Sequence, residues 1–157
     1  RLHFPGARHV MSGTAWEYWT SEENLTSMSG QLAKWARANL PPLADRIELV
    51  SGETEILPGI TAMDAPGHTP GQMALLVRSG AHKLMCLADA AHNPVQMAYP
   101  GIGYAYDMDR DEARSTRREI AGKCLKDHHL VFGCHFPFPG LGYFEETDGK
   151  RVWKGIE

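Results

Sequence analysis

Three residues that can bind a metal ion each follow a short apolar run in this sequence. His68 lies in the turn-rich stretch "DAPGHTPGQ" (64–72), Asp89 comes directly after "KLMCLA", and His135 comes directly after "LVFGC". Two imidazoles and a carboxylate form a ligand set that a borderline divalent ion such as zinc accepts. Because the strand ends of one sheet can meet at one edge, we predict that these side chains converge there and bind a metal.

Each of the three residues also has a structural interpretation when it is taken alone. An aspartate after a strand often caps a helix or closes a turn, and a histidine in a turn often bonds to backbone groups. The metal hypothesis therefore rests on the three residues together, since each follows an apolar run and has glycine or proline nearby.

The elements that must position these residues are short strands. Runs of apolar or alternating residues separated by turn residues predict them. These runs are "ARHVMS", "RIELV", "TEIL", "ITAMDA", "QMALLV", "KLMCLA", "HLVFGCHF", "YFEE" and "RVWKG". "SGAH" (79–82) is expected to be a hairpin turn between two of them.

Three helices are expected beside the strands. "GTAWEYWT" (13–20) predicts a short one, and apolar residues at three- and four-residue steps, including Leu25 and Trp35, predict a second that ends at Pro41. The third begins after Asp109, which can cap it. The pattern as a whole predicts an α+β fold, with a mainly antiparallel sheet and helices on one face.

Charge and composition argue against several classes of protein. The formal net charge is −3 without a basic cluster, so we expect no nucleic-acid partner. No apolar stretch approaches the ~18 residues of a transmembrane helix, so we expect no membrane partner. The three cysteines, Cys86, Cys124 and Cys134, are too few and too unevenly spaced for a disulfide framework. The compartment stays open between cytoplasm and periplasm.

The order of three motifs resembles a known enzyme family. "GHTPGQ", "LADAAH" and "GCHFPFPGLG" follow one another as in the second half of metallo-β-lactamase-fold hydrolases. The likeness is greatest to the branch that contains methyl parathion hydrolase and lactonase-like enzymes, which the opening "FPGARHVMS" also resembles. The resemblance implies that residues 1–157 form half of an αββα sandwich.

The same resemblance implies a role for each candidate residue. His68 would bind a first metal, Asp89 would bridge two metals, and His135 would bind the second. The implied cofactor is zinc, with two ions in the intact enzyme, although other divalent metals also suit these ligands. His92 stands where lactonase relatives hold a Tyr or His that faces the substrate. The catalytic residues would then be Asp89 and His92, and His92 would donate a hydrogen bond to the substrate's carbonyl or phosphoryl oxygen. The alternative for His92 is a structural contact within "HNPVQ".

One part of the family's pattern has no counterpart in this sequence. The H-x-H-x-D-H motif supplies most ligands from the first half of the fold, and no H-x-H occurs here. We therefore expect residues 1–157 to be the C-terminal portion of the domain and to be inactive alone. The sheet face left open would need a partner, either the N-terminal half or a second copy in a homodimer.

The function expected of the intact protein is metal-dependent hydrolysis of a small-molecule lactone, ester or phosphotriester. A hydroxide that bridges two metals would attack the substrate. The candidates to line the substrate pocket are Met97, Tyr99, Phe136, Phe138 and the loop 98–107. The alternative is that they are ordinary core and loop residues. Two alternatives remain, a thioester hydrolase of the glyoxalase II type and a non-catalytic module without a complete metal site.

Overall fold

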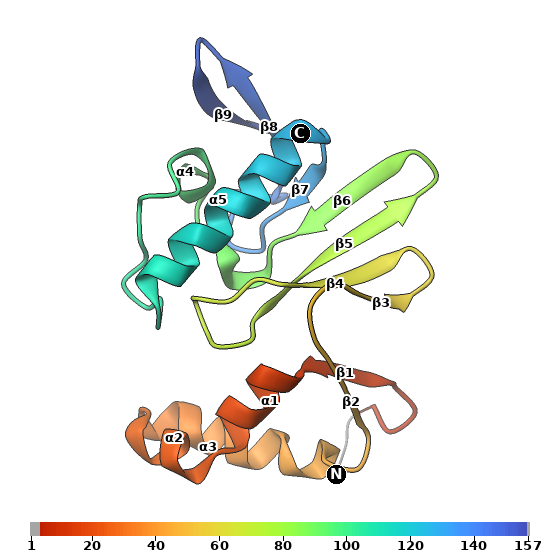
Figure 1. Ribbon diagram of the computed structural model, residues 1–157, viewed down its shortest axis with the longest axis vertical. Helices are drawn as coiled ribbons and strands as arrows, with labels where there is room; N and C mark the ends of the chain where they lie inside the picture. Colours follow the sequence, from red (N-terminus) through yellow and green to blue (C-terminus); the bar gives the residue numbers. More distant parts are fainter. Residues whose placement is uncertain (1–3, 157) are drawn as a thin grey trace. The chain divides into compact units, whose positions relative to one another are not determined.

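The first of two units in the chain combines a small sheet with helices. The computed structural model describes residues 4–156, and the chain divides into two units after Ser51. In the first unit β1 (His9–Ser12) pairs in parallel with β2 (Ile47–Val50). The chain between these strands forms α1 (Gly13–Thr20), α2 (Glu22–Ser27), α3 (Gly30–Asn39) and the short 3-10 helix η1 (Pro41–Leu43) (Figure 1).

The apolar spacing from Leu25 onward predicted one helix, and this prediction was wrong. The segment forms two helices, because the backbone is extended at Met28, with φ −80° and ψ 166°. Ser29 then starts the second helix, its carbonyl accepting a hydrogen bond from the amide of Ala33. The buried face of α3 consists of small residues such as Ala33, whereas Trp35 is 56% exposed.

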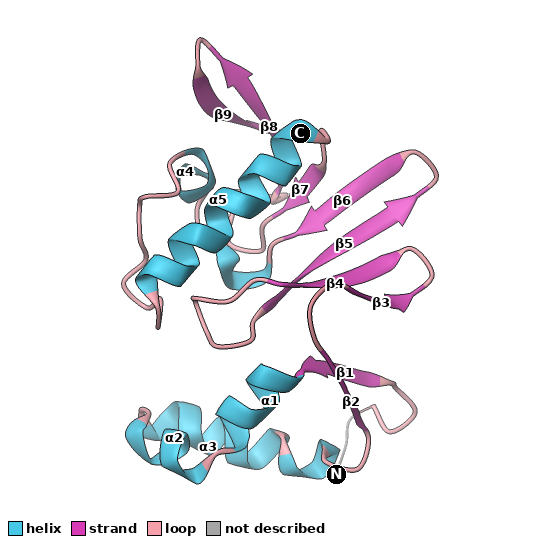
Figure 2. Ribbon diagram, viewed as in Figure 1, coloured by secondary structure: helices cyan, strands magenta, loops and turns pink. Residues whose placement is uncertain are grey.

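The second unit is built on a seven-stranded sheet with helices (Figure 2). The strands lie in chain order across the sheet: β3 (Thr54–Leu57), β4 (Ile60–Asp64), β5 (Met73–Ser79), β6 (His82–Cys86), β7 (Leu130–Phe132), β8 (Leu141–Thr147) and β9 (Lys150–Gly155). Neighbouring strands are antiparallel except β6 and β7, which are parallel. The predicted mainly antiparallel sheet is therefore confirmed.

The connection from β6 to β7 carries the helices of this unit. It forms the 3-10 helix η2 (Ala88–Ala90), then α4 (Pro94–Ala98) and α5 (Arg110–Lys126). As predicted, Asp109 caps α5, since its side chain accepts hydrogen bonds from the amides of Asp111 and Glu112. In the part of the chain that the structure describes, none of the helices combines the length and apolar character needed to cross a membrane.

The main core lies between α5 and one face of the sheet (Figure 1). Burial alternates along β5: Ala74 and Leu76 are buried, whereas Leu75 and Val77 are only half-buried. The buried side chains from the sheet and α5 include Met63, Leu76, Met85, Val131, Phe144, Ile120, Ala121 and Cys124. Removal of this apolar surface from water is the main force that holds the helix on the sheet.

The opposite face of the sheet also carries apolar side chains, but these stay accessible. They lie at the alternate positions of the central strands and include Leu75, Val77, Leu84, Cys86 and Leu130. Phe132 is 37% exposed. Met97 of α4 and Ile120 of α5 both belong to the core on the other face, so neither helix covers this apolar stripe.

Candidate functional site

Three loops of the second unit meet at one edge of its sheet. β4 and β6 run in the same direction because both are antiparallel to β5, and β7 is parallel to β6. The carboxyl ends of these three strands therefore lie at the same edge. The loops that follow them carry His68, Asp89 and His135, so the structure brings the loops of the three predicted ligands to the same edge of the sheet.

The side chains of these residues and of His92 form one cluster. His135 Nε2 lies 2.8 Å from Asp89 Oδ1, and His92 Nε2 lies 3.9 Å from the same oxygen. The ring centroids of His68 and His92 are 4.7 Å apart, as are those of His92 and His135. His92 therefore contacts both of the other imidazoles.

The turn that carries His68 is closed by its own backbone and joined to α5. The amide of Ala65 donates to the carbonyl of Gln72 at 2.7 Å, which closes the base of the turn. The carbonyls of Gly67 and His68 accept hydrogen bonds from the amides of Asp109 and Met108 at 2.9 and 3.1 Å. The start of the helix thus fixes the backbone from which the imidazole projects.

Gly67→Ala is expected to disrupt this turn. Gly67 has φ +117°, which residues with a β-carbon avoid, and a β-carbon there would collide with the backbone of Ala113 in α5. We expect a loss of about 3 kcal/mol in the free energy of unfolding, measured by urea denaturation. Gly80→Ala is the matched control, since Gly80 has φ +56° but open space around it. Equal losses in the two variants would show that the approach to α5 does not set the cost.

A buried ion pair lies behind His68. Asp107 Oδ1 is 3.3 Å from His68 Nδ1, and Asp107 Oδ2 accepts hydrogen bonds from Arg117 Nη2 at 3.1 Å and from the backbone amide of Tyr104 at 3.0 Å. The side chains of Asp107 and Arg117 are both 0% exposed. When His68 donates from Nδ1 to this carboxylate, its Nε2 lone pair is free to bind a metal.

Arg117 also connects the helix to the loop of Asp89. Its Nη1 donates to the carbonyl of Ala90 in η2 at 3.3 Å. Sequence reasoning identified neither Asp107 nor Arg117. Arg117 lies among several arginines on α5, and its pattern in the sequence does not distinguish it from exposed Arg118 beside it.

The turn that carries His135 adds a fourth candidate ligand. β7 ends at Phe132, so His135 lies in the following turn, which Phe136 N closes on Gly133 O at 3.0 Å. Cys134 Sγ lies 3.9 Å from Asp89 Oδ1, and the ligand atoms of Asp89, Cys134 and His135 are within 4.8 Å of one another. A carboxylate, a thiol and an imidazole in this arrangement fit a divalent ion of borderline softness.

His92 is held by its backbone, and its surroundings disfavour the protonated ring. Gln96 Oε1 accepts hydrogen bonds from the backbone amides of His92 and Asn93 at 2.7 and 3.1 Å, which fixes the start of α4. Burial, and then the nearby imidazoles of His68 and His135, lower the pKa of His92. Its Nδ1 is buried and has no hydrogen-bond partner among the described residues. A neutral imidazole can donate a hydrogen bond from one nitrogen and accept one at the other.

The aromatic residue beside the cluster is Tyr104. Its ring stacks on that of His92 with centroids 3.9 Å apart. Met97 and Phe136, two of the residues considered as pocket lining, are buried in the main core, and Phe138 is 100% exposed. Core packing was the alternative for Phe136, and the structure favours it. Tyr104 lies in the loop 98–107 that the sequence indicated, but spacing did not distinguish it from the other tyrosines there.

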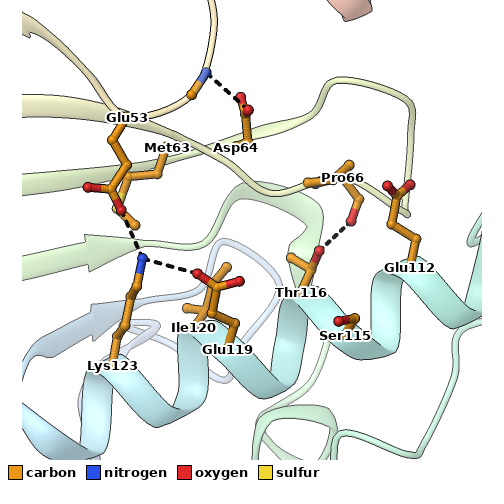
Figure 3. A pocket seen from close by; sticks show the side chains of 11 residues that line it. Glu53, Met63, Asp64, Pro66, Glu112, Ser115, Thr116, Glu119, Ile120 and Lys123 are labelled. Atoms are coloured by element: carbon orange, nitrogen blue, oxygen red, sulfur yellow. Dashed lines mark hydrogen bonds and ion pairs between the residues drawn. The ribbon is translucent and has the colours of Figure 1, made fainter.

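A separate pocket of about 360 Å³ lies against α5 (Figure 3). Lys123 Nζ contacts Glu53 Oε1 at 2.8 Å and Glu119 Oε1 at 3.2 Å, and Thr116 Oγ1 donates to the carbonyl of Pro66 at 2.7 Å (Figure 3). These polar groups are already paired. None of the four predicted site residues lines the pocket, so it is not part of the cluster.

Comparisons with known proteins relate the chain to hydrolases. No protein-family model matches it. An N-acyl homoserine lactonase of Bacillus sp. is 28% identical over 91 residues, which cover 56% of this chain and 35% of that protein. AidC, a dizinc quorum-quenching lactonase in complex with a product, N-hexanoyl-L-homoserine, has a TM-score of 0.85 and 23% identity, over 100% of this chain and 57% of that chain.

A second solved structure supports the same fold. The hydrolase AbOPH of the beta-lactamase superfamily has a TM-score of 0.84 and 22% identity, over 98% of this chain and 56% of that chain. The α+β fold predicted from the sequence is therefore confirmed, and it matches the fold of these two solved structures. The chain spans little more than half the length of these two solved proteins.

Proposed function

We propose that this chain contributes to the dinuclear site of a metal-dependent hydrolase that opens a lactone ring. The observation that carries the proposal is the cluster of His68, Asp89, His92 and His135 at one edge of the sheet. The lactonases among its relatives favour a lactone as the substrate class. In finer terms we propose an N-acyl homoserine lactone as substrate and zinc as the metal, because AidC is a dizinc lactonase with such a product.

Each residue of the cluster has one task in this proposal. His68 would hold one ion, His135 would hold the other, and Asp89 would be shared between them. Zinc lowers the pKa of a bound water to about 7 and polarises a carbonyl group. Asp107 keeps His68 oriented through Nδ1, and His92 donates a hydrogen bond to the substrate's carbonyl oxygen. Tyr104 restricts water on the far side of the His92 ring.

The remaining ligands, in this proposal, come from an H-x-H-x-D-H segment of the intact protein. His68, Asp89 and His135 cannot complete two shells of four ligands each. The half-exposed apolar stripe that includes Leu75 and Phe132 is a surface against which the rest of an αββα sandwich packs. A second copy of the chain is the other candidate for that surface.

The deciding experiment is a substrate panel on the intact protein. We expect it to hydrolyse N-hexanoyl homoserine lactone, with a loss of turnover when a chelator is added. Residues 1–157 alone are expected to show no appreciable turnover. Higher kcat/KM for an aryl phosphotriester would instead place the protein in the methyl parathion hydrolase branch. Hydrolysis of a thioester alone would favour the glyoxalase II type. Chelator-sensitive turnover by residues 1–157 would contradict the proposal that these residues alone hold an incomplete metal site.

His92→Ala is expected to lower turnover by about 10²-fold while leaving the metal in place. The reason is that the variant loses a hydrogen-bond donor to the substrate but no ligand. The measurement is kcat on the lactone together with metal content by elemental analysis. His82→Ala serves as the control, because His82 is exposed at the start of β6. Loss of metal from the His92 variant would make His92 a ligand or a group that orients one.

A further inference from the structure

Cys134 occupies a position that the proposed roles do not use. It belongs to the same short turn as His135 and lies against the loop of Asp89. Its Sγ is 3.9 Å from Asp89 Oδ1 and 3.5 Å from the carbonyl of Ala88. The thiol therefore approaches the same carboxylate oxygen that His135 Nε2 contacts at 2.8 Å.

We propose that Cys134 is a ligand of the metal ion that Asp89 and His135 bind. Three donor atoms of different kinds lie within 4.8 Å of one another, so small side-chain rotations bring all three to one ion with bonds of about 2.0–2.3 Å. The inference rests on the proposed metal site and adds a thiolate to it. The sulfur loses its proton to solvent when it binds the ion.

The other two cysteines provide the contrast that makes Cys134 distinctive. Cys124 is buried in the main core, where burial raises the pKa of its thiol to about 12. Cys86 lies on the apolar face of β6. Neither belongs to the only group of three or more potential ligands found among the described residues. The cysteines therefore differ in surroundings, and within the described part of the chain only Cys134 shares a group of potential ligands with a carboxylate and an imidazole.

A thiolate ligand makes the two ions of the site chemically different. The ion on the His68 side has no sulfur donor within the described cluster, whereas the ion on the His135 side has one. Sulfur favours zinc, cobalt or cadmium over magnesium or manganese. We therefore infer that the His135 position selects soft metals and retains them more strongly than the His68 position.

The test is the absorption spectrum of the intact protein loaded with Co²⁺. We expect a thiolate-to-cobalt charge-transfer band in the near ultraviolet, in addition to the visible bands of bound cobalt. Cys134→Ser should lose the charge-transfer band and keep visible bands, and its affinity for Cd²⁺ should fall at least about tenfold. Cys86→Ser is the matched control and should keep both.

A second measurement needs no variant. Alkylation of each cysteine by iodoacetamide is followed by mass spectrometry, with and without bound zinc. We expect zinc to protect Cys134 and to leave the labelling of Cys86 unchanged. Equal labelling of Cys134 in the two states would overturn the proposal even if Cys134→Ser failed to fold.

The outcomes separate this inference from the proposed function. Cobalt bound with visible bands but without a charge-transfer band would remove Cys134 from the ligand set, and the hydrolase proposal would stand. An intact protein that binds no cobalt at all would overturn both proposals. A charge-transfer band that survives in Cys134→Ser and disappears in Cys86→Ser would assign the thiolate to Cys86 and contradict the inference.

Discussion

Asp89→Ala is expected to lose metal and activity together, with the rate falling by about 10³-fold or more. Asp89 is the centre of the cluster, because its Oδ1 contacts His135 Nε2 at 2.8 Å and lies 3.9 Å from both His92 Nε2 and Cys134 Sγ. A bound metal contributes several kcal/mol to transition-state stabilisation, and each 1.36 kcal/mol corresponds to about tenfold in rate. In the proposed site, loss of this carboxylate therefore releases metal, and with it the stabilisation that a bound metal gives the transition state.

The measurement pairs elemental analysis with kcat on the same preparation of intact protein. Asp45→Ala is the control, since Asp45 is an exposed aspartate of the first unit. That variant should keep both metal content and activity. Two metals per chain in Asp89→Ala would remove Asp89 from the bridging role, whatever the rate.

Arg117→Met is expected to cause the largest loss of stability, about 3–5 kcal/mol in the free energy of unfolding. The guanidinium of Arg117 is buried and pairs with the equally buried carboxylate of Asp107 at 3.1 Å. Methionine fills much of the same space but leaves that carboxylate without its guanidinium. Breaking a buried pair by removing one partner is costly because the other charge remains out of water.

Urea denaturation followed by circular dichroism measures this loss. Arg118→Met is the matched control, because Arg118 is the next residue of α5 and is exposed. It should change stability by no more than about 0.5 kcal/mol. Similar unfolding midpoints for the two variants would mean that the Asp107 carboxylate is stabilised without Arg117, for example by His68 and the amide of Tyr104.

Local signals predicted the elements of the second unit well. Alternating apolar residues and turn residues located its strands, and Asp109 located the start of α5. The same reasoning failed between Leu25 and Asn39, where apolar spacing suited one helix and the chain forms two. A periodic pattern shows which residues favour a helix. A residue with extended backbone, such as Met28, can still interrupt the helix without changing the spacing of the apolar residues.

Sequence patterns predicted the α+β fold class and the meeting of His68, Asp89 and His135 at one edge of the sheet. They could do so because each residue follows a strand with a recognisable pattern, and parallel strand ends share an edge. Only the tertiary structure identified Asp107 and Arg117, together with the neighbours Tyr104 and Cys134 of the cluster. Burial of a charge and contact between distant loops depend on how α5 and the turns pack, and no local pattern encodes that packing.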